Sequence, residues 1–236
     1  MMDVLDQFWQ AYLYSNNGSL SGMAVTLWLL VLSVSMGFFI SIFLAVARVS
    51  SRRWLSIPLW TFSYVFRGTP LYVQILFIYA GVYSLDLVKG TPTLATFFQS
   101  GFNCVVLALT LNTVAYTTEI FAGAIRATSA GEIEAARSFG MTRFALYRRV
   151  ILPSALRRAL PAYSNEVILM LHATSLAFTA TVPDILKVAR DANSATYQTF
   201  ASYGIAALLY LGLSFTLIGL FRWYEHRTLA YLGTHR

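Results

Sequence analysis

Long uncharged segments alternate with short charged ones along most of the chain. No Asp, Glu, Lys or Arg occurs from Gln7 to Ala47. At about 1.5 Å per residue, a helix over residues 22–48 is long enough to cross a bilayer core of about 30 Å. Four later segments have the same character, so the pattern predicts an all-α integral membrane protein with five transmembrane helices. We expect them at about 22–48, 69–86, 102–126, 160–182 and 203–223.

The composition agrees with this pattern and excludes several classes of protein. Of the 236 residues, 57% are hydrophobic and only 11% are charged, whereas about a quarter of the residues in a soluble domain are charged. A soluble enzyme, a secreted disulfide scaffold and a disordered chain are therefore excluded. The single cysteine and three scattered histidines offer no metal-site spacing. We expect one transmembrane permease domain over residues 1–236.

The basic residues indicate how the chain is oriented. Of the 17 Lys and Arg residues, 13 fall on one side of the predicted spans, three (Lys89, Lys187 and Arg190) fall on the other, and Arg67 is unassigned. Positive loops face the cytoplasm, so we expect the C-terminus inside and the N-terminus outside. The basic residues that set the membrane orientation then account for the net charge of +7, and no nucleic acid partner is expected. The larger group comprises Arg48, Arg52, Arg53, Arg126, Arg137, Arg143, Arg148, Arg149, Arg157, Arg158, Arg222, Arg227 and Arg236.

The cytoplasmic loop between spans 3 and 4, residues 128–153, has signals for ordered structure. Ser129 with Glu132 three positions later fits a capping box at a helix start. Gly140 stands where a helix end needs a left-handed residue, and Thr142 can cap the next helix. Pro153 lacks a backbone N–H and tolerates a bend into the next span. These signals predict two short helices joined by a sharp glycine turn.

The same loop resembles the EAA loop of binding-protein-dependent ABC importer permeases. The pattern consists of Glu134-Ala135-Ala136, Gly140 and Val150-x-Leu152-Pro153, with Val150 where the family usually has isoleucine. Residues 66–71 (Phe-Arg-Gly-Thr-Pro-Leu) and 164–167 (Ser-Asn-Glu-Val) look like the polar amino acid branch. In that family the loop sits in a cleft of the ATPase subunit. The residues expected to couple to the ATPase are Glu132, Glu134, Ala135, Ala136, Gly140, Val150, Leu152 and Pro153.

The resemblance implies a function and a set of partners. It implies a permease subunit in the bacterial cytoplasmic (inner) membrane that imports histidine, lysine, arginine and ornithine. It also implies an ATP-binding subunit dimer, a second homologous permease chain and a periplasmic solute-binding protein. No G-x-x-x-x-G-K-[ST] loop occurs in the chain, so ATP and Mg²⁺ are expected on the partner ATPase and no cofactor on this chain. The alternative for the loop itself is a solvated amphipathic linker.

Two acids, Glu119 and Glu166, fall inside predicted spans. An ionised acid at mid-bilayer costs roughly 2.5–3.5 kcal/mol on insertion scales, so both should face protein or water rather than lipid. Helical spacing places Glu119 on one face with other polar residues of its span. One interpretation is a substrate path that offsets a cationic ligand; the other is an ion pair with Arg67 or Arg126. The candidate path residues are Asn112, Tyr116, Glu119, Asn165 and Glu166.

Two other classes of protein compete with a permease. His172 and Ser175 could serve an intramembrane hydrolase, but no Gly-x-Ser-x-Gly elbow is present, and no catalytic residue is assigned. We interpret His172 as a packing or hydrogen-bonding residue. A channel or scaffold subunit would not need a capped helix pair with this spacing. Arg67-Gly68-Thr69-Pro70 disfavours regular helix, and the sequence leaves open whether residues 54–66 enter the bilayer.

Overall fold

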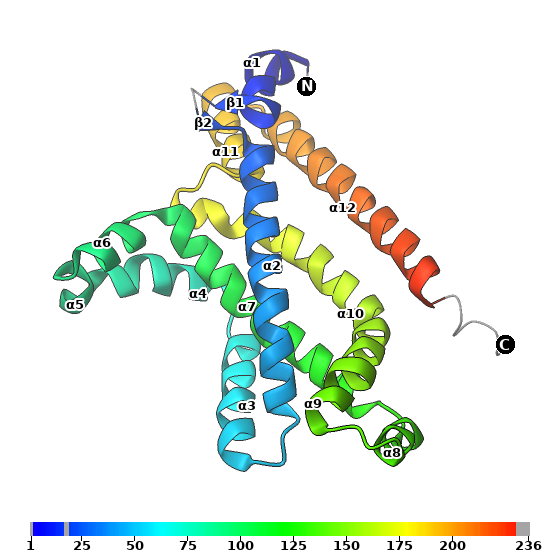
Figure 1. Cartoon of the computed structure of the whole chain (residues 1–236). Coiled ribbons are helices and arrows are strands. Elements are labelled where there is room, and N and C mark those ends of the chain that lie inside the picture. The colour runs from blue at the N-terminus through cyan, green and yellow to red at the C-terminus, as the bar shows by residue number, and fades with distance from the viewer. Residues whose placement is uncertain (1, 17–18, 230–236) are drawn as a thin grey trace.

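The computed structural model describes residues 2–16 and 19–229, and these residues are almost entirely helical (Figure 1). The β structure among them is one short antiparallel hairpin. In chain order the elements are α1 (Met2–Leu13), β1 (Ser15–Asn16), β2 (Ser19–Leu20), α2 (Gly22–Arg48), α3 (Arg53–Gly68), α4 (Leu71–Leu76), η1 (Phe77–Val82), α5 (Asp86–Lys89), α6 (Pro92–Gln99), α7 (Gly101–Arg126), α8 (Ala130–Ser138), α9 (Arg143–Leu146), η2 (Tyr147–Ile151), α10 (Leu152–Ala173), η3 (Thr174–Ala180), α11 (Ile185–Thr196) and α12 (Thr199–Leu229).

Within these described residues, three helices are long and apolar enough to cross a membrane unbroken, namely α2, α7 and α12. Two further candidates are bent pairs. One joins α3 to the α4–η1 segment at 104°, and the other joins the helix over residues 143–180 to α11 at 52°. The chain therefore has between three and five candidate spans. The all-helical prediction is confirmed, and the helices α2 and α7 cover the residues expected for the first and third spans.

The second predicted span differs from a straight helix over 69–86. Its α-helical part ends at Leu76 and is followed by the π-helix η1, and the whole segment turns sharply away from α3. Thr69 takes an extended conformation (φ −109°, ψ 142°), as expected for a residue before proline. Pro70 is the N-cap residue of α4 and has no backbone N–H that needs a partner. The Arg67–Pro70 segment is thus the break between two helices.

The centre of the bundle is the contact between α2 and α7. Gly37 allows the two helices to approach closely, because a Cβ there would lie 2.3 Å from the Thr113 Cγ2 atom. Around this contact, Leu29, Leu109 and Leu171 are fully buried and belong to one hydrophobic cluster. This packing places α7 between α2 and α10, so the face of α7 that carries Asn112 and Tyr116 is held in a defined rotation.

At the far end of the bundle from α1, the α8–α9 segment forms the predicted loop (Figure 1). Ser129 accepts a hydrogen bond from the Glu132 N–H, Thr142 accepts one from the Ala145 N–H, and Gly140 has a φ of +72°. The caps and the glycine turn are confirmed. The second short helix, α9, is present after the Thr142 cap, but it does not end in a bend before the next span, because η2 and α10 follow it without a break. The π-helical turn directly before Leu152 accommodates Pro153 in this continuous arm.

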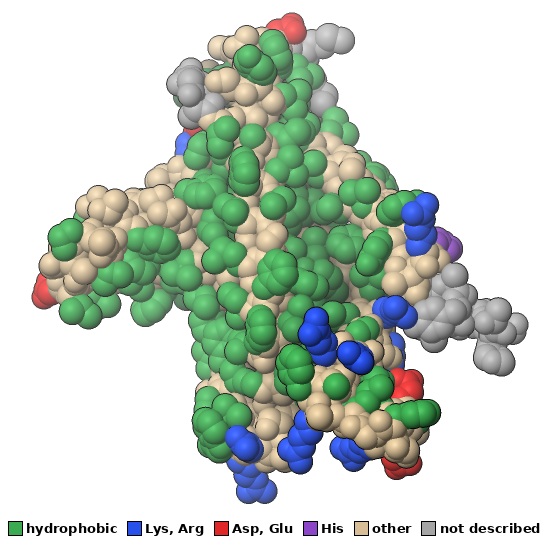
Figure 2. Space-filling view, in the orientation of Figure 1, with side chains coloured by type: hydrophobic (Ala, Val, Ile, Leu, Met, Phe, Trp, Pro, Cys, Tyr) green, Lys and Arg blue, Asp and Glu red, His purple; other side chains and the backbone are tan. Residues whose placement is uncertain are grey.

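Charged and apolar side chains separate along the long axis of the molecule. Figure 2 shows hydrophobic side chains over the middle of the visible face and Lys and Arg gathered toward the end that carries α3, α8 and α9. At the opposite end, α1 packs on α11 and α12 through Val4 and Tyr12, which are buried in a second hydrophobic cluster. This distribution is the one expected of a chain that spans a bilayer.

Candidate coupling loop and substrate cavity

The α8 helix has one face against the bundle and one face in solvent. Ala136 is buried and belongs to the hydrophobic cluster that also includes residues of α7 and α10, whereas Glu132, Glu134 and Ala135 are exposed. The small side chain of Ala136 lets α8 lie close beneath the bundle. The two acids and Ala135 are consequently presented together on the outer face of the loop.

Two aromatic residues near the glycine turn are unusually exposed for large apolar side chains. Phe139 is 85% exposed and Phe144 is 73% exposed, and they flank Gly140 on either side. Exposed aromatic anchors of this kind are enriched at protein interfaces. Neither residue was predicted as functional from the sequence, although a phenylalanine on each side of a predicted glycine turn was the available signal.

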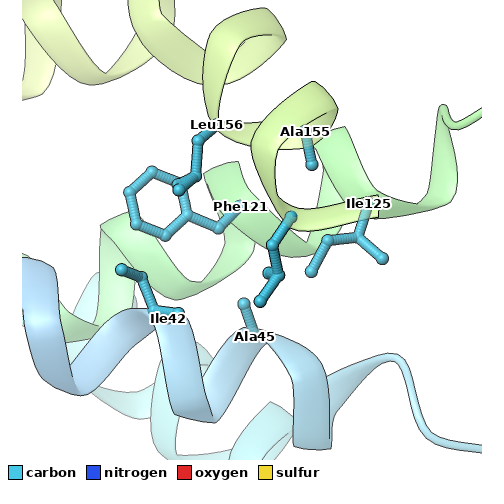
Figure 3. Close-up of a pocket in the computed structure, with 7 residues that line it drawn as sticks. Ile42, Ala45, Phe121, Ile125, Ala155 and Leu156 are labelled. Atoms are coloured by element: carbon cyan, nitrogen blue, oxygen red, sulfur yellow. The ribbon is translucent and has the colours of Figure 1, made fainter. Parts of the chain in front are cut away.

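The remaining residues of the loop pattern connect the loop to the membrane helices. Val150 and Leu152 pack against a hydrophobic cluster formed by α2, α7 and α10, and Pro153 occupies the first turn of α10. Figure 3 shows the junction next to them, where Ala45, Phe121, Ile125 and Ala155 converge. This junction has no space for a water molecule. A dry, close-packed contact moves as a unit, so α10 and α7 are mechanically joined directly above the loop.

A small cavity of about 170 Å³ lies between α7 and α10, and it brings together three of the predicted path residues. Asn112, Tyr116 and Glu166 line it with Leu169, Met170 and Ala173. Glu166 is only 6% exposed. Within the described part of the chain its carboxylate has no hydrogen-bonded or ion-paired partner, and Arg67 acts on it electrostatically. An ionised carboxylate is costly to bury without a partner, so a cation that entered the cavity would stabilise the charged form of Glu166.

The break between α3 and α4 forms the neighbouring side of this region, held by the side chain of Gln74. Its Nε2 atom donates to the Phe66 carbonyl (2.7 Å) and to the Thr69 carbonyl and hydroxyl (3.1 and 2.8 Å). Its Oε1 atom accepts from Asn112 Nδ2 at 3.3 Å. Gln74 thus satisfies the carbonyls left free where α3 ends and fastens the break to α7. In the sequence, the signal for this role was a glutamine, Gln74, one helical turn after Pro70.

Arg67 lies against the same face of α7. Its guanidinium carbon is 5.1 Å from the centre of the Tyr116 ring, and its carbonyl accepts a hydrogen bond from the Tyr116 hydroxyl at 3.4 Å. A cation–π contact of this kind orients the guanidinium without neutralising it. Arg67 therefore contributes a positive charge near the carboxylate of Glu166. Among the described residues the two do not form the ion pair that was one of the interpretations from the sequence.

Two predicted path residues lie outside the cavity. Glu119 forms an ion pair with Arg48 at 2.7 Å, so the ion-pair interpretation holds, but the suggested partners Arg67 and Arg126 were wrong. Asn165 is exposed and does not line the cavity. Adjacent residues of an α-helix point about 100° apart. Because Glu166 points into the cavity, Asn165 points away from it.

His172 has the hydrogen-bonding role that was predicted for it. One of its ring nitrogens, Nε2, lies 3.0 Å from the Ser214 hydroxyl, which links α10 to α12. Ser175 donates to the His172 carbonyl rather than meeting the ring. Among the residues that the structure describes, no group of three or more His, Cys, Asp or Glu side chains could hold a metal ion.

The chain matches the family model described as "Binding-protein-dependent transport system inner membrane component" over residues 37–230. The chain belongs to this family. It is 60% identical to the histidine/lysine/arginine/ornithine transport system permease protein HisM of Salmonella typhimurium, over 99% of this chain and 100% of that protein. Identity to HisM of Escherichia coli K12 is also 60%, over 98% of each chain.

A solved structure has a similar fold. This permease superimposes on a chain of the crystal structure of an amino acid ABC transporter with histidines with a TM-score of 0.76, at 34% identity. The match covers 87% of this chain and 92% of that one. The permease is thus a membrane component of an ABC amino acid transport system in the inner membrane, and it is not itself the ATPase of that system.

Proposed function

We propose that this permease moves basic amino acids, namely histidine, lysine, arginine and ornithine, into the cytoplasm by alternating access. The observation that carries the proposal is Glu166, a buried residue that lines the cavity and whose carboxylate has no bonded partner among the described residues. A cationic side chain or α-ammonium group can compensate it, and the nearby Arg67 can receive the α-carboxylate. The relatives named for histidine, lysine, arginine and ornithine transport support the same substrates.

The energy for transport comes from outside the chain. We infer that two ATP-binding subunits bind ATP with Mg²⁺ and close together, and that their closure moves the exposed face of α8. The acids Glu132 and Glu134, with Phe139 and Phe144 at the turn, supply the contact. The continuous arm from Arg143 into α10 passes this movement to the helix that carries Glu166. ATP binding then shifts the population between inward-open and outward-open states.

The orientation follows from the charge distribution. We propose that the end carrying α8 and α9 is cytoplasmic and that α1 and α11 face the periplasm, where a solute-binding protein docks. The arginines of the loop and of α3 support this assignment through the positive-inside rule. The C-terminal residues 230–236, expected in the cytoplasm, lie outside the described residues.

A second permease chain completes the pathway in this proposal. The cavity at Glu166 is small, and the neighbouring break between α3 and α4 leaves an apolar hollow of about 470 Å³ on the outside of the bundle. Two of its lining residues, Val73 and Phe77, are 53% and 68% exposed. A homologous chain packed there would cover this surface.

The test of the substrate assignment is ATPase activity of the reconstituted complex, stimulated by binding protein loaded with charged or neutral amino acids. Basic amino acids should stimulate hydrolysis and enter the vesicles. Glu166→Gln should reduce uptake of basic amino acids while the complex still assembles, and the matched control Asn165→Ala, on the exposed face one residue away, should not. Unchanged uptake in Glu166→Gln would remove the counter-charge role.

The test of docking is co-purification of the ATPase subunit with the permease. Glu134→Lys and Phe139→Ala should each lose the ATPase subunit while helix content in detergent stays the same. Phe200→Ala provides the control, because Phe200 is 90% exposed at the opposite end of the molecule. Full retention of the ATPase by both loop variants would disprove the docking face.

A further inference from the structure

Arg158, on the helix that follows the coupling loop (residues 128–153), forms hydrogen bonds to the beginning of that loop and to the end of α7. It lies in the second turn of α10, and its Nη1 atom donates to the Ser154 hydroxyl at 2.7 Å. Its Nη2 atom donates to the Thr128 hydroxyl at 2.8 Å and to the Ala124 carbonyl at 3.3 Å. Thr128 directly precedes Ser129, the residue that caps α8. One guanidinium thus joins the end of α7 and the beginning of the loop to the helix that leaves the loop.

The surroundings of Arg158 differ from those of an ordinary surface arginine. Thr128 is only 8% exposed, and the Arg158 Nε atom is buried with no hydrogen-bond partner in the described part of the chain. The two ion pairs found among the described residues do not include Arg158. Its charge instead faces the carboxyl-terminal end of α7, where the helix dipole favours a cation.

The guanidinium contact and the dry junction of Figure 3 act on the same pair of helix ends. Ala155 and Leu156 pack against Phe121 and Ile125 of α7 in that junction. Arg158 adds one directional hydrogen bond from α10 to the last turn of α7 and another to Thr128 just beyond that turn. Apolar packing resists separation of the two helices, whereas hydrogen bonds to fixed acceptors also resist sliding and rotation.

We propose that Arg158 is a positioning residue that holds the base of the coupling loop. This proposal rests on the proposed function, in which α8 receives the movement of the ATPase. Without the Arg158 contacts, α8 could pivot at the 127–129 connection and at Gly140, and the movement would be absorbed in the loop. With them, displacement of α8 is transmitted to α7 and α10 together, and hence to both walls of the cavity.

The chain offers a matched control for this residue. Arg157 is the preceding residue on α10 and carries the same charge, but it is exposed. Arg158→Met removes the hydrogen bonds and keeps a long unbranched side chain, and Arg157→Met makes the same chemical change next to it. Arg158→Lys restores the charge with a single donor group, and Thr128→Val removes one acceptor while keeping the shape of the side chain.

The experiment uses the complete complex in proteoliposomes with its binding protein, and it measures uptake of a basic amino acid per ATP hydrolysed. A coupling energy of 1–3 kcal/mol corresponds to about a fivefold or larger effect, so Arg158→Met should lower uptake per ATP by about fivefold or more. Basal ATP hydrolysis and co-purification of the ATPase should stay near wild type. Arg158→Lys should recover part of the loss, Thr128→Val should show a smaller loss, and Arg157→Met should behave as wild type.

A second measurement on the same complexes does not depend on the substrate. Amide hydrogen exchange over residues 128–138 should be faster in Arg158→Met and Thr128→Val than in Arg157→Met. If wild type shows no uptake of basic amino acids but the exchange difference is present, the substrate assignment fails and the role of Arg158 in holding the loop stands. If Arg158→Met does not assemble, Thr128→Val decides the question. The proposal would be overturned if amide exchange over residues 128–138 stayed at the wild-type rate in those Arg158→Met and Thr128→Val complexes that assemble. It would also be overturned if Arg157→Met lowered uptake per ATP as much as Arg158→Met.

Discussion

Arg48 and Glu119 form an ion pair that joins the last turn of α2 to α7, with 2.7 Å between Nε and Oε1. The same arginine donates to the Ser56 hydroxyl at 3.1 Å, and Ser56 donates back to the Arg48 carbonyl at 2.9 Å. The pair therefore connects three helices at the end of the bundle that carries the coupling loop. Its side chains are 15% and 18% exposed, so each charge depends on the other for compensation.

Removing one partner of this pair should destabilise the permease more than removing both. Glu119→Gln or Arg48→Met leaves one partly buried charge unpaired, at an expected cost of about 1–3 kcal/mol, and the double variant should recover part of it. Thermal unfolding in detergent, analysed as a double-mutant cycle, measures the coupling. The exposed pair Lys187–Asp191 (30% and 54% exposed) is the control and should contribute about 0.5 kcal/mol or less. Additive effects at Arg48 and Glu119 would contradict the pair.

The Gln74 side chain should be essential for the break between α3 and α4 because it donates to backbone carbonyls. Gln74→Glu keeps the shape but replaces the donor with an acceptor, so it should destabilise the permease by roughly 1–3 kcal/mol. Thermal unfolding is the measurement. Gln99→Glu is the control, since the side chain of exposed Gln99 donates to the Tyr83 hydroxyl in a solvent-exposed hydrogen bond, and it should be nearly neutral. Equal unfolding temperatures for the two variants would remove the capping role.

Gly140 should tolerate substitution poorly because of its backbone conformation rather than for lack of space. Its φ is +72°, and apart from Gly140 and its two chain neighbours no heavy atom of the described residues lies within 4 Å of the position that a Cβ would take. Gly140→Ala should cost about 1–2 kcal/mol locally and make the loop more sensitive to trypsin at Arg137 and Arg143, whereas Gly140→Asn should be milder. Gly131→Ala, at an equally open position inside α8, is the control and should not increase cleavage.

Tyr12 anchors α1 to the rest of the chain through a buried hydroxyl that donates to the Ser202 carbonyl at 3.2 Å. Burial raises the pKa of Tyr12 to about 12. Tyr12→Phe should lower stability by about 1 kcal/mol at neutral pH. Because the folded pKa lies above the unfolded value near 10, the wild type loses stability as the pH rises from 10 to 12. The stability difference between wild type and Tyr12→Phe should therefore narrow over that range in detergent unfolding, and a constant difference would contradict the assignment.

The features that could be predicted from the sequence are those set by residues close together in the chain. The helices α2 and α7 follow from uninterrupted apolar runs, and the loop follows from Ser129, Gly140 and Thr142, whose effects act within a few positions of the chain. The break at Pro70 was visible as disfavoured helix, but its 104° angle was not. That angle depends on Gln74 and Asn112, which lie 38 positions apart.

The amino-acid sequence by itself determined the membrane class, the family and the capped loop with its left-handed glycine, because hydropathy, spacing and backbone preference are properties of neighbouring residues. Only the tertiary structure decided that Glu166 rather than Asn165 lines the cavity, that Glu119 pairs with Arg48 and that Arg158 contacts Thr128. These relationships depend on the rotation of each helix against its neighbours, and that rotation is set by packing such as Gly37 against Thr113.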